Sequence, residues 1–270
     1  MTRLTVQNIG KCPDDLKDYD QWLKGITNLG LLELALKTTD MTPEEYKARV
    51  TSFTRVAVIP ITMGRGIIPS FSEKVAELGC FLGLPCRVTE FRDVAGWREA
   101  VAGGSQMVVC ADDNAFLAFN LTSRRVVDNC LATGEVYAAA LGAAVDGVAE
   151  RAVGVLGLGP VGQAAANWLH SRGAHLVVHD KDPNKQVGFL SCRGRIRGAK
   201  SVGEVLGETN LVIDATNDSD IIKARQLKRR LILSAPGIPL GIDDPSSHMV
   251  DLIHDPLQLG VAAMMVQAVG

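Results

Sequence analysis

The stretch RAVGVLGLGPVGQAAANWLHSRGAHLVVHD, residues 151–180, decides the fold of this chain. Its first apolar run, AVGVL, is typical of a buried strand, and the apolar spacing of QAAANWLH is typical of a helix. A second apolar run, HLVVH, predicts another strand. Because strand, helix and strand follow one another within a single short unit, the stretch predicts a parallel sheet of the Rossmann type.

Three glycines between the first strand and the helix, Gly157, Gly159 and Gly162, form the pattern G-x-G-x-x-G. The first permits a tight turn, the second lets the backbone approach a pyrophosphate, and the third lets the helix pack closely on the strand. The helix start would present free N–H groups and a partial positive charge to phosphates. A turn without a nucleotide, or a loop for FAD or a nucleotide sugar, is the alternative. The predicted cofactor-binding residues of this loop are Gly157, Leu158, Gly159, Pro160, Val161 and Gly162.

Residues at three later strand ends extend the cofactor prediction. Asp180 ends the second strand, where its carboxylate can accept hydrogen bonds from the adenosine ribose hydroxyls. Because its charge would repel a 2′-phosphate, we predict NAD rather than NADP as the cofactor. The runs LVIDAT and LILSAPG place Thr216 and Pro236 at the ligand-binding edge of a doubly wound sheet, so both are predicted to contact the cofactor. Ordinary strand-end turns are the alternative.

Outward from this unit, the chain divides into two predicted domains. Residues 149–270 form a Rossmann domain, a doubly wound parallel sheet followed by an apolar terminal helix. Residues 1–148 begin with helices and then alternate strands with helices, which predicts an α/β substrate domain. In this half FLAFNL is expected to be helical, and residues 133–150 are expected to form a connector helix capped by Thr133. The predicted fold class is therefore α/β with two domains.

Composition excludes several classes of function. The chain has 270 residues and a net charge of −2, so no overall field attracts nucleic acid or an anionic membrane. No apolar run is long enough to cross a bilayer. The six cysteines form no C-x-x-C pair and no zinc pattern with histidine, so we expect no metal and a cytoplasmic location. The expected partner is a small-molecule substrate, and a homodimer is left open.

Polar residues in three loops of the first half are the candidates for a substrate site. They lie in residues 62–66, in residues 112–114, and at Asn129. Asp112 directly follows the predicted strand SQMVVC, where a carboxylate could bind a cationic group of a substrate. The alternative for Asp112 is a plain helix cap, and Asp113 is expected to cap the following helix.

Several blocks of the chain resemble the pyrrolysine synthase family. They are VIPITMGRGIIPSFSEKV, ADDNAFLAFNL, GLGPVG, SAPGIP and DPLQLGVAAMM, in this order. The resemblance implies that NAD oxidises 3-methyl-D-ornithyl-N6-L-lysine at the carbon bearing the terminal amine. The imine then loses ammonia by hydrolysis, and the semialdehyde closes onto the α-amine to give L-pyrrolysine.

The resemblance also implies residue roles. Asp112 would hold the substrate ammonium group and is the predicted catalytic residue, while Leu4 in the N-terminal stretch would help to cover the substrate. The chain departs from the family at Met63, where a small hydroxyl residue is expected, so a polar contact to the substrate is lost. The predicted substrate-binding residues are Leu4, Met63, Asp112 and Asn129.

Two other functions compete with this interpretation. One is another two-domain NAD(P) dehydrogenase of the shikimate or methylenetetrahydrofolate type, which would depend on a lysine such as Lys74. The other is an NAD-sensing protein without catalysis. The first half contains no histidine, so it offers no imidazole base, and proton transfer would use water or the substrate's own amines.

The assignment of Asp180 predicts the cofactor preference. Asp180→Ala is expected to weaken NAD binding and to reduce the difference in affinity between NAD and NADP. The substitution removes both the acceptor for the ribose hydroxyls and the charge that repels a 2′-phosphate. Titration of the unaltered and altered proteins with each cofactor measures this. Equal use of both cofactors by the unaltered protein would contradict the assignment.

Overall fold

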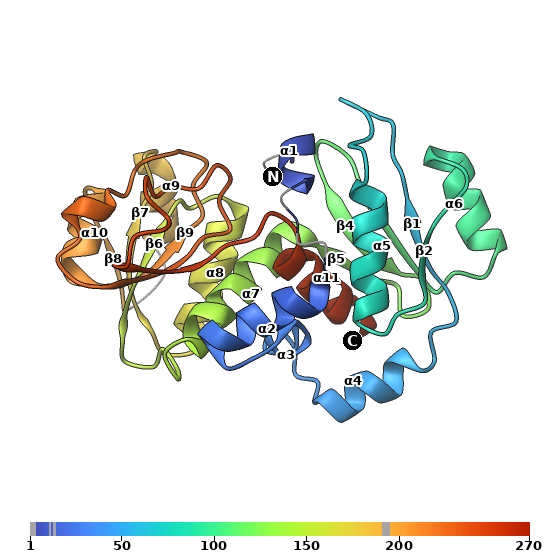
Figure 1. Ribbon diagram of the computed structural model, residues 1–270, viewed down its shortest axis with the longest axis horizontal. Helices are drawn as coiled ribbons and strands as arrows, with labels where there is room; N and C mark the ends of the chain where they lie inside the picture. The colour runs from blue at the N-terminus through green and yellow to red at the C-terminus, as the bar shows by residue number, and fades with distance from the viewer. Residues whose placement is uncertain (1–3, 11, 13–14, 191–194) are drawn as a thin grey trace.

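The computed structural model describes residues 4–10, 12, 15–190 and 195–270, in which the strands form two sheets (Figure 1). The sheet of the first half consists of β1 (Val56–Ile59), β2 (Cys86–Val88), β3 (Met107–Ala111), β4 (Phe116–Asn120) and β5 (Arg125–Asp128). The sheet of the second half consists of β6 (Ala152–Leu156), β7 (His175–His179), β8 (Ile196–Gly198), β9 (Leu211–Asp214), β10 (Leu231–Ser234) and β11 (Val250–Ile253).

The second sheet is the predicted Rossmann sheet. Its order is β11–β10–β9–β6–β7–β8, and all of its strand pairs are parallel. The quoted stretch forms β6, the following helix and β7 as predicted, so the α/β fold class is confirmed. The connecting helices are α8 (Pro160–Ser171), α9 (Pro183–Leu190), α10 (Val202–Glu208) and the short η1 (Ala224–Gln226).

The first sheet is mixed, in the order β2–β1–β3–β4–β5. β1, β2 and β3 are parallel and alternate in the chain with α5 (Phe71–Phe81) and α6 (Asp93–Ala102). The helical prediction for FLAFNL is wrong, because these residues form β4, which pairs antiparallel with β3. Burial in β4 alternates between fully and partly buried residues, which is the period of a strand. A tight turn, with the Asp112 N–H donating to the Ala115 carbonyl at 2.9 Å, returns the chain as a hairpin.

The connector helix α7 (Asn129–Ala143) begins and ends earlier than predicted. Asp128 is its N-cap and accepts a hydrogen bond from the Cys130 N–H at 2.7 Å, so the predicted cap at Thr133 is wrong. Gly134 packs against α8, where a β-carbon would overlap the carbonyl oxygen of Val161. The missing side chain therefore allows close approach of α7 and α8, and so of the two halves.

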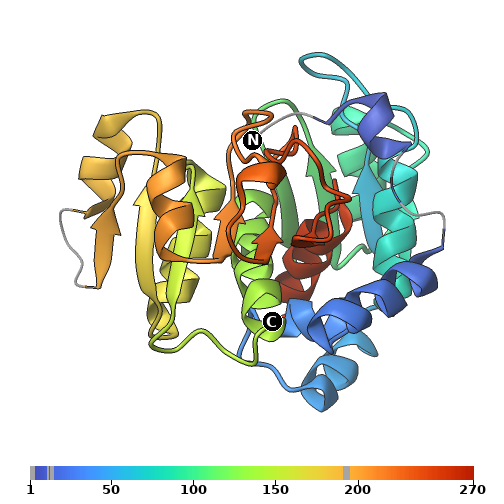
Figure 2. The same ribbon diagram turned by 60° about the vertical axis from the view of Figure 1, so that its left-hand side comes forward.

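The terminal helix α11 (Gln258–Val269) is buried along its whole length. It packs against α7 and against β4 and β5, and its apolar side chains belong to the core of the first half. Figures 1 and 2 show α7 and α11 between the two sheets. The predicted boundary near residue 149 stays a prediction, but the last helix of the chain completes the core of the first half.

The predicted helical start is confirmed. The described residues before β1 form four helices, and the last of them has the predicted Thr42 cap with Pro43 at its first position. Figure 1 shows the second and third helices alongside α7 and α11. Within the described ranges no helix has the length and apolarity needed to cross a membrane. The four helices are α1 (Val6–Ile9), α2 (Leu16–Thr27), α3 (Leu31–Leu36) and α4 (Pro43–Val50).

A buried carboxylate, Asp255, ties α2 to the middle of the molecule. Its Oδ2 accepts a hydrogen bond from the Tyr19 hydroxyl at 2.6 Å and lies 3.0 Å from the Tyr137 hydroxyl. Its Oδ1 accepts from the Leu257 N–H at 2.9 Å, directly before α11. Burial, and next the charge of Asp255, raise the pKa of both tyrosines well above the ordinary value. The tyrosines therefore remain neutral donors to the carboxylate.

Tyr19→Phe is expected to reduce the free energy of unfolding by about 1–3 kcal/mol at neutral pH, because Asp255 loses a buried donor. Since the pKa of Tyr19 is raised on folding, its contribution is complete below the unfolded pKa of about 10 and is lost as pH rises above it. The variant should therefore lose less stability than the unaltered protein between about pH 9 and pH 11. Urea unfolding at several pH values measures both effects, and identical losses would contradict the assignment.

Candidate functional site

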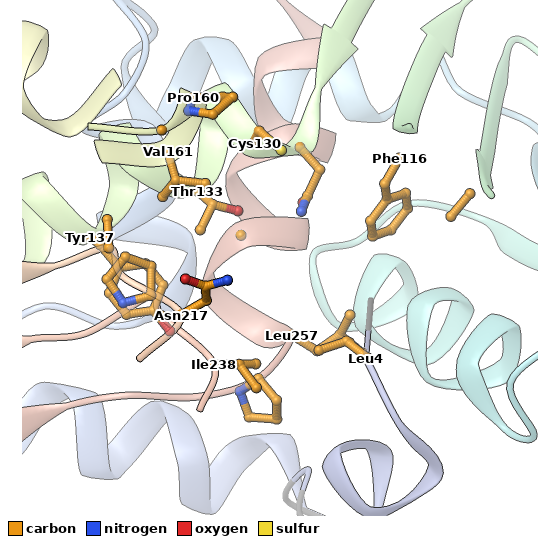
Figure 3. A pocket seen from close by; sticks show the side chains of 18 of the residues that line it. Leu4, Phe116, Cys130, Thr133, Tyr137, Pro160, Val161, Asn217, Ile238 and Leu257 are labelled. Carbon is orange, nitrogen blue, oxygen red and sulfur yellow. The ribbon is translucent and has the colours of Figure 1, made fainter. Parts of the chain in front are cut away.

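A cavity of about 540 Å³ lies between the two sheets, at the carboxyl ends of β1, β3, β6, β7, β9 and β10. Figure 3 shows Leu4 and Phe116 from the first half on one side, facing Val161, Asn217 and Ile238 from the second half. The carboxyl ends of parallel strands are where α/β sheets bind ligands. This cavity is therefore the candidate functional site.

The glycine loop forms one wall of the cavity. Gly157 has a φ of +83°, a conformation that favours glycine, and a β-carbon at Gly162 would overlap the Gly157 carbonyl oxygen. At Gly159 the space for a β-carbon is open, and Gly159, Pro160 and Val161 line the cavity. The tight turn, the close helix and the open space at Gly159 fit a bound diphosphate.

Asp180 is fixed beside this loop at the end of β7. Its Oδ2 accepts a hydrogen bond from the Leu158 N–H at 2.6 Å, and its Oδ1 accepts from the Asp182 N–H at 2.8 Å. The residue is 9% exposed and lines the cavity. Leu158 itself is buried and does not line this cavity, so its described role is to hold the Asp180 carboxylate. The Asp180 carboxylate is therefore held in one position, in the part of the cavity where the adenosine ribose is expected.

The ends of β9 and β10 form the adjoining wall. Thr216 and Pro236 line the cavity, and the Thr216 hydroxyl donates to Asp214 Oδ1 at 2.7 Å. Burial raises the pKa of Asp214, opposed by its hydrogen bonds from Thr216. Asn217 and Ile238, which the sequence analysis did not single out, also line the cavity. Both residues lie close after a predicted strand end, and that position could have marked them as candidate site residues.

Asp112 lines the opposite side of the cavity. Its Oδ1 accepts hydrogen bonds from the N–H groups of Asn114 at 2.7 Å and Ala115 at 2.8 Å, which closes the hairpin turn. The same carboxylate therefore has a structural task in addition to its predicted substrate contact. The prediction that Asp113 caps a helix is wrong, because a strand follows and Asp113 Oδ2 accepts from the Arg65 N–H at 2.8 Å.

The other predicted substrate residues differ in position. Leu4 and Asn129 line the cavity, and so does Thr133 one turn further along α7. Asn129 Oδ1 and Thr133 Oγ1 are buried and have no hydrogen-bond partner within the described residues. Met63 is 68% exposed and is not among the residues that line the cavity. The structure therefore brings three of the four predicted residues together and leaves Met63 outside.

The rest of the substrate-side wall is apolar. None of these apolar side chains was among the predicted site residues, because nothing in the sequence distinguished them from other apolar residues. Lys74 is not part of this wall; its Nζ lies 3.6 Å from Glu77 Oε2 on the same helix. An apolar wall with one carboxylate suits a substrate with aliphatic segments and a cationic end. The larger apolar residues of this wall include Ile59, Ile61, Ile67, Ile68, Phe71, Val109 and Phe116.

Comparisons with known proteins agree over most of the chain. Residues 8–127 match the family model described as pyrrolysine biosynthesis protein PylD, N-terminal domain. The chain is 28% identical over 267 residues to the pyrrolysine synthase of Methanosarcina acetivorans, covering 98% of both chains. It is 30% identical over 217 residues to that of Methanosarcina barkeri, covering 80% of this chain and 81% of the relative.

Among solved structures, shikimate dehydrogenase from Aquifex aeolicus matches with a TM-score of 0.52 at 12% identity, over 80% of this chain and 91% of that chain. At this identity the likeness concerns the fold alone. It agrees with the predicted two-domain α/β fold class.

Substitution of Gly159 is expected to affect cofactor binding, whereas substitution of Gly162 is expected to affect stability. Gly159→Val is expected to keep the melting temperature nearly unchanged and to abolish dinucleotide binding, because its side chain would fill the open space beside Pro160. Gly162→Val is expected to lower the melting temperature strongly, because it would collide with the Gly157 carbonyl. Thermal unfolding with and without NAD measures both. Normal NAD binding by Gly159→Val would remove the loop from the cofactor site.

Proposed function

The chain belongs to the pyrrolysine synthase family, and from this premise we propose that it is an NAD-dependent amine dehydrogenase that makes L-pyrrolysine. Its substrate is 3-methyl-D-ornithyl-N6-L-lysine. The observation that carries the proposal is that one cavity joins the glycine loop and Asp180 to Asp112 and an apolar wall. A dinucleotide and an elongated amine can therefore meet in the same space.

The chemistry divides between the cofactor and the chain. When bound, NAD supplies a hydride acceptor. Gly157, Gly159 and Val161 would hold its diphosphate, and Asp180 its adenosine ribose. The amine-bearing carbon of the substrate loses a hydride and its nitrogen a proton, which leaves an imine. Water adds to the imine, ammonia leaves, and the α-amine closes onto the resulting aldehyde with loss of water.

The residues of the substrate side would position these steps. The Asp112 carboxylate would bind the substrate ammonium, while Leu4 and Phe116 would cover the aliphatic part and exclude bulk water. Asp255 also lines the cavity, but its carboxylate oxygens accept hydrogen bonds from Tyr19 and from the backbone of Leu257. The proton released on oxidation would therefore pass to water or to a substrate amine.

Two competing functions lose support. A shikimate-type mechanism needs a lysine at the substrate, and Lys74 does not line the cavity. A purely NAD-sensing protein would not need Asp112 and the apolar wall opposite the dinucleotide loop. The expectations of a cytoplasmic location and of a homodimer stay predictions.

The deciding experiment is incubation of the purified protein with NAD and 3-methyl-D-ornithyl-N6-L-lysine. NADH formation followed by absorbance, together with release of ammonia and the mass of L-pyrrolysine, is the expected result. Free D-ornithine and shikimate serve as control substrates. NAD binding without NADH formation would favour the sensing protein, and turnover of shikimate alone would favour the shikimate-type enzyme.

Asp112→Asn is expected to lower turnover of the ornithyl-lysine substrate by about ten- to a hundredfold, because a charge-assisted hydrogen bond contributes about 1.5–3 kcal/mol. NAD affinity should stay nearly unchanged. Asp113→Asn is the matched control, because Asp113 is adjacent in the hairpin turn but does not line the cavity. Steady-state kinetics, NAD titration and thermal unfolding are measured for both. If Asp112→Asn keeps full turnover, Asp112 is a turn residue and not part of the substrate site.

A further inference from the structure

Among the charged side chains that line the cavity, carboxylates outnumber lysines. Its described lining carries four carboxylates and two lysines, Lys181 and Lys185, with no arginine. A dinucleotide brings two further negative charges in its diphosphate. Both lysines are exposed at the edge of the cavity, so a lysine that is not already paired can turn its charge to an incoming diphosphate. The four acids are Asp112, Asp180, Asp218 and Asp255.

Lys181 is already neutralised. Its Nζ lies 2.8 Å from both carboxylate oxygens of Asp218, which follows β9 in the chain. Binding a phosphate would require this two-oxygen ion pair to be broken or shared. Lys181 is therefore a poor source of charge for a cofactor.

Lys185 has no such partner. It lies in the first turns of α9, and its side chain makes no ion pair or hydrogen bond with any other described residue. It lines the cavity together with Gly159 and Pro160, and the same three residues also line a second, smaller hollow. The free ammonium group is thus placed beside the two residues at which a diphosphate would approach the backbone.

The local backbone increases the need for this charge. α8 begins with Pro160, which has no N–H group, so the helix start offers one donor fewer than it would with another residue. The Leu158 N–H is already donated to Asp180. Two of the backbone groups nearest to the approaching phosphates are therefore absent or occupied.

We infer that Lys185 binds the diphosphate of the dinucleotide and supplies the positive charge that the start of α8 provides incompletely. This inference rests on the proposed use of NAD. It makes Lys185 a cofactor-binding residue outside the glycine loop, contributed by the element that follows Asp180. The contact is a long-range charge interaction as well as a hydrogen bond, so it should depend on ionic strength.

The test is calorimetric titration of Lys185→Gln with NAD, ADP-ribose and adenosine. Affinity for NAD and ADP-ribose is expected to fall about tenfold, and affinity for adenosine to change less than about twofold, because adenosine carries no phosphate. Lys185→Arg should restore most of the affinity. Lys181→Gln, the matched control from the same cavity, should change NAD affinity by less than about threefold. The salt dependence of NAD binding should also be shallower for Lys185→Gln than for the unaltered protein.

Several results would overturn the inference. Unchanged NAD affinity in Lys185→Gln would show that the lysine is a solvated surface residue. An equal loss for adenosine would place it at the ribose, and a greater loss for NADP than for NAD would place it at a 2′-phosphate. If the unaltered protein bound neither NAD nor ADP-ribose, the proposed function would fall as well. The unaltered protein therefore separates failure of the cofactor assignment from failure of the Lys185 contact.

Discussion

The two halves of the molecule meet where Gly134 of α7 faces the Val161 carbonyl of α8 without an intervening side chain. The first turn of α8 carries the end of the glycine loop, and the same turn of α7 carries Thr133, which lines the cavity. Because no side chain lies between the helices at this point, α7 and α8 approach closely, and a larger residue at position 134 would push the two helices apart.

The sequence predicted the Rossmann sheet well because its evidence is local. The glycines 157, 159 and 162 and the apolar runs beside them depend on steric demands within about thirty residues. The hairpin formed by β4 was missed because its residues are apolar almost without a break, so neither period stood out. Pairing with β3, which lies before it in the chain, decided the outcome. The start of α7 was misplaced because Asp128 and Thr133 are both acceptable caps, and only the hairpin that precedes the helix selects Asp128.

The candidate site was predictable in part for the same reason. Asp112, Asp180 and Thr216 end strands, and the strand ends of both sheets converge on one cavity. Ile67, Phe71 and Phe116 could not be separated from core residues, since an apolar side chain gives the same sequence signal in a wall and in a core. Met63 was chosen by resemblance, but the loop that holds it projects into solvent. The carboxylates of the cavity differ in their surroundings. Asp180 and Asp255 accept hydrogen bonds that fix their positions, while Asp112 closes a turn and also lines the cavity.

The burial of α11 has a consequence for folding during synthesis on the ribosome. Val261, Met264 and Met265 belong to the same apolar core as Leu34 and Val58, although they follow the whole Rossmann sheet in the chain. The first half is therefore synthesised before the helix that completes its core, and the groove for α11 stays open until the whole Rossmann sheet has been made. Until then its apolar surface is open to chaperones and to other nascent chains. A chain truncated before α11 would contain every strand of the second sheet but would lack the helix that fills the core of the first half.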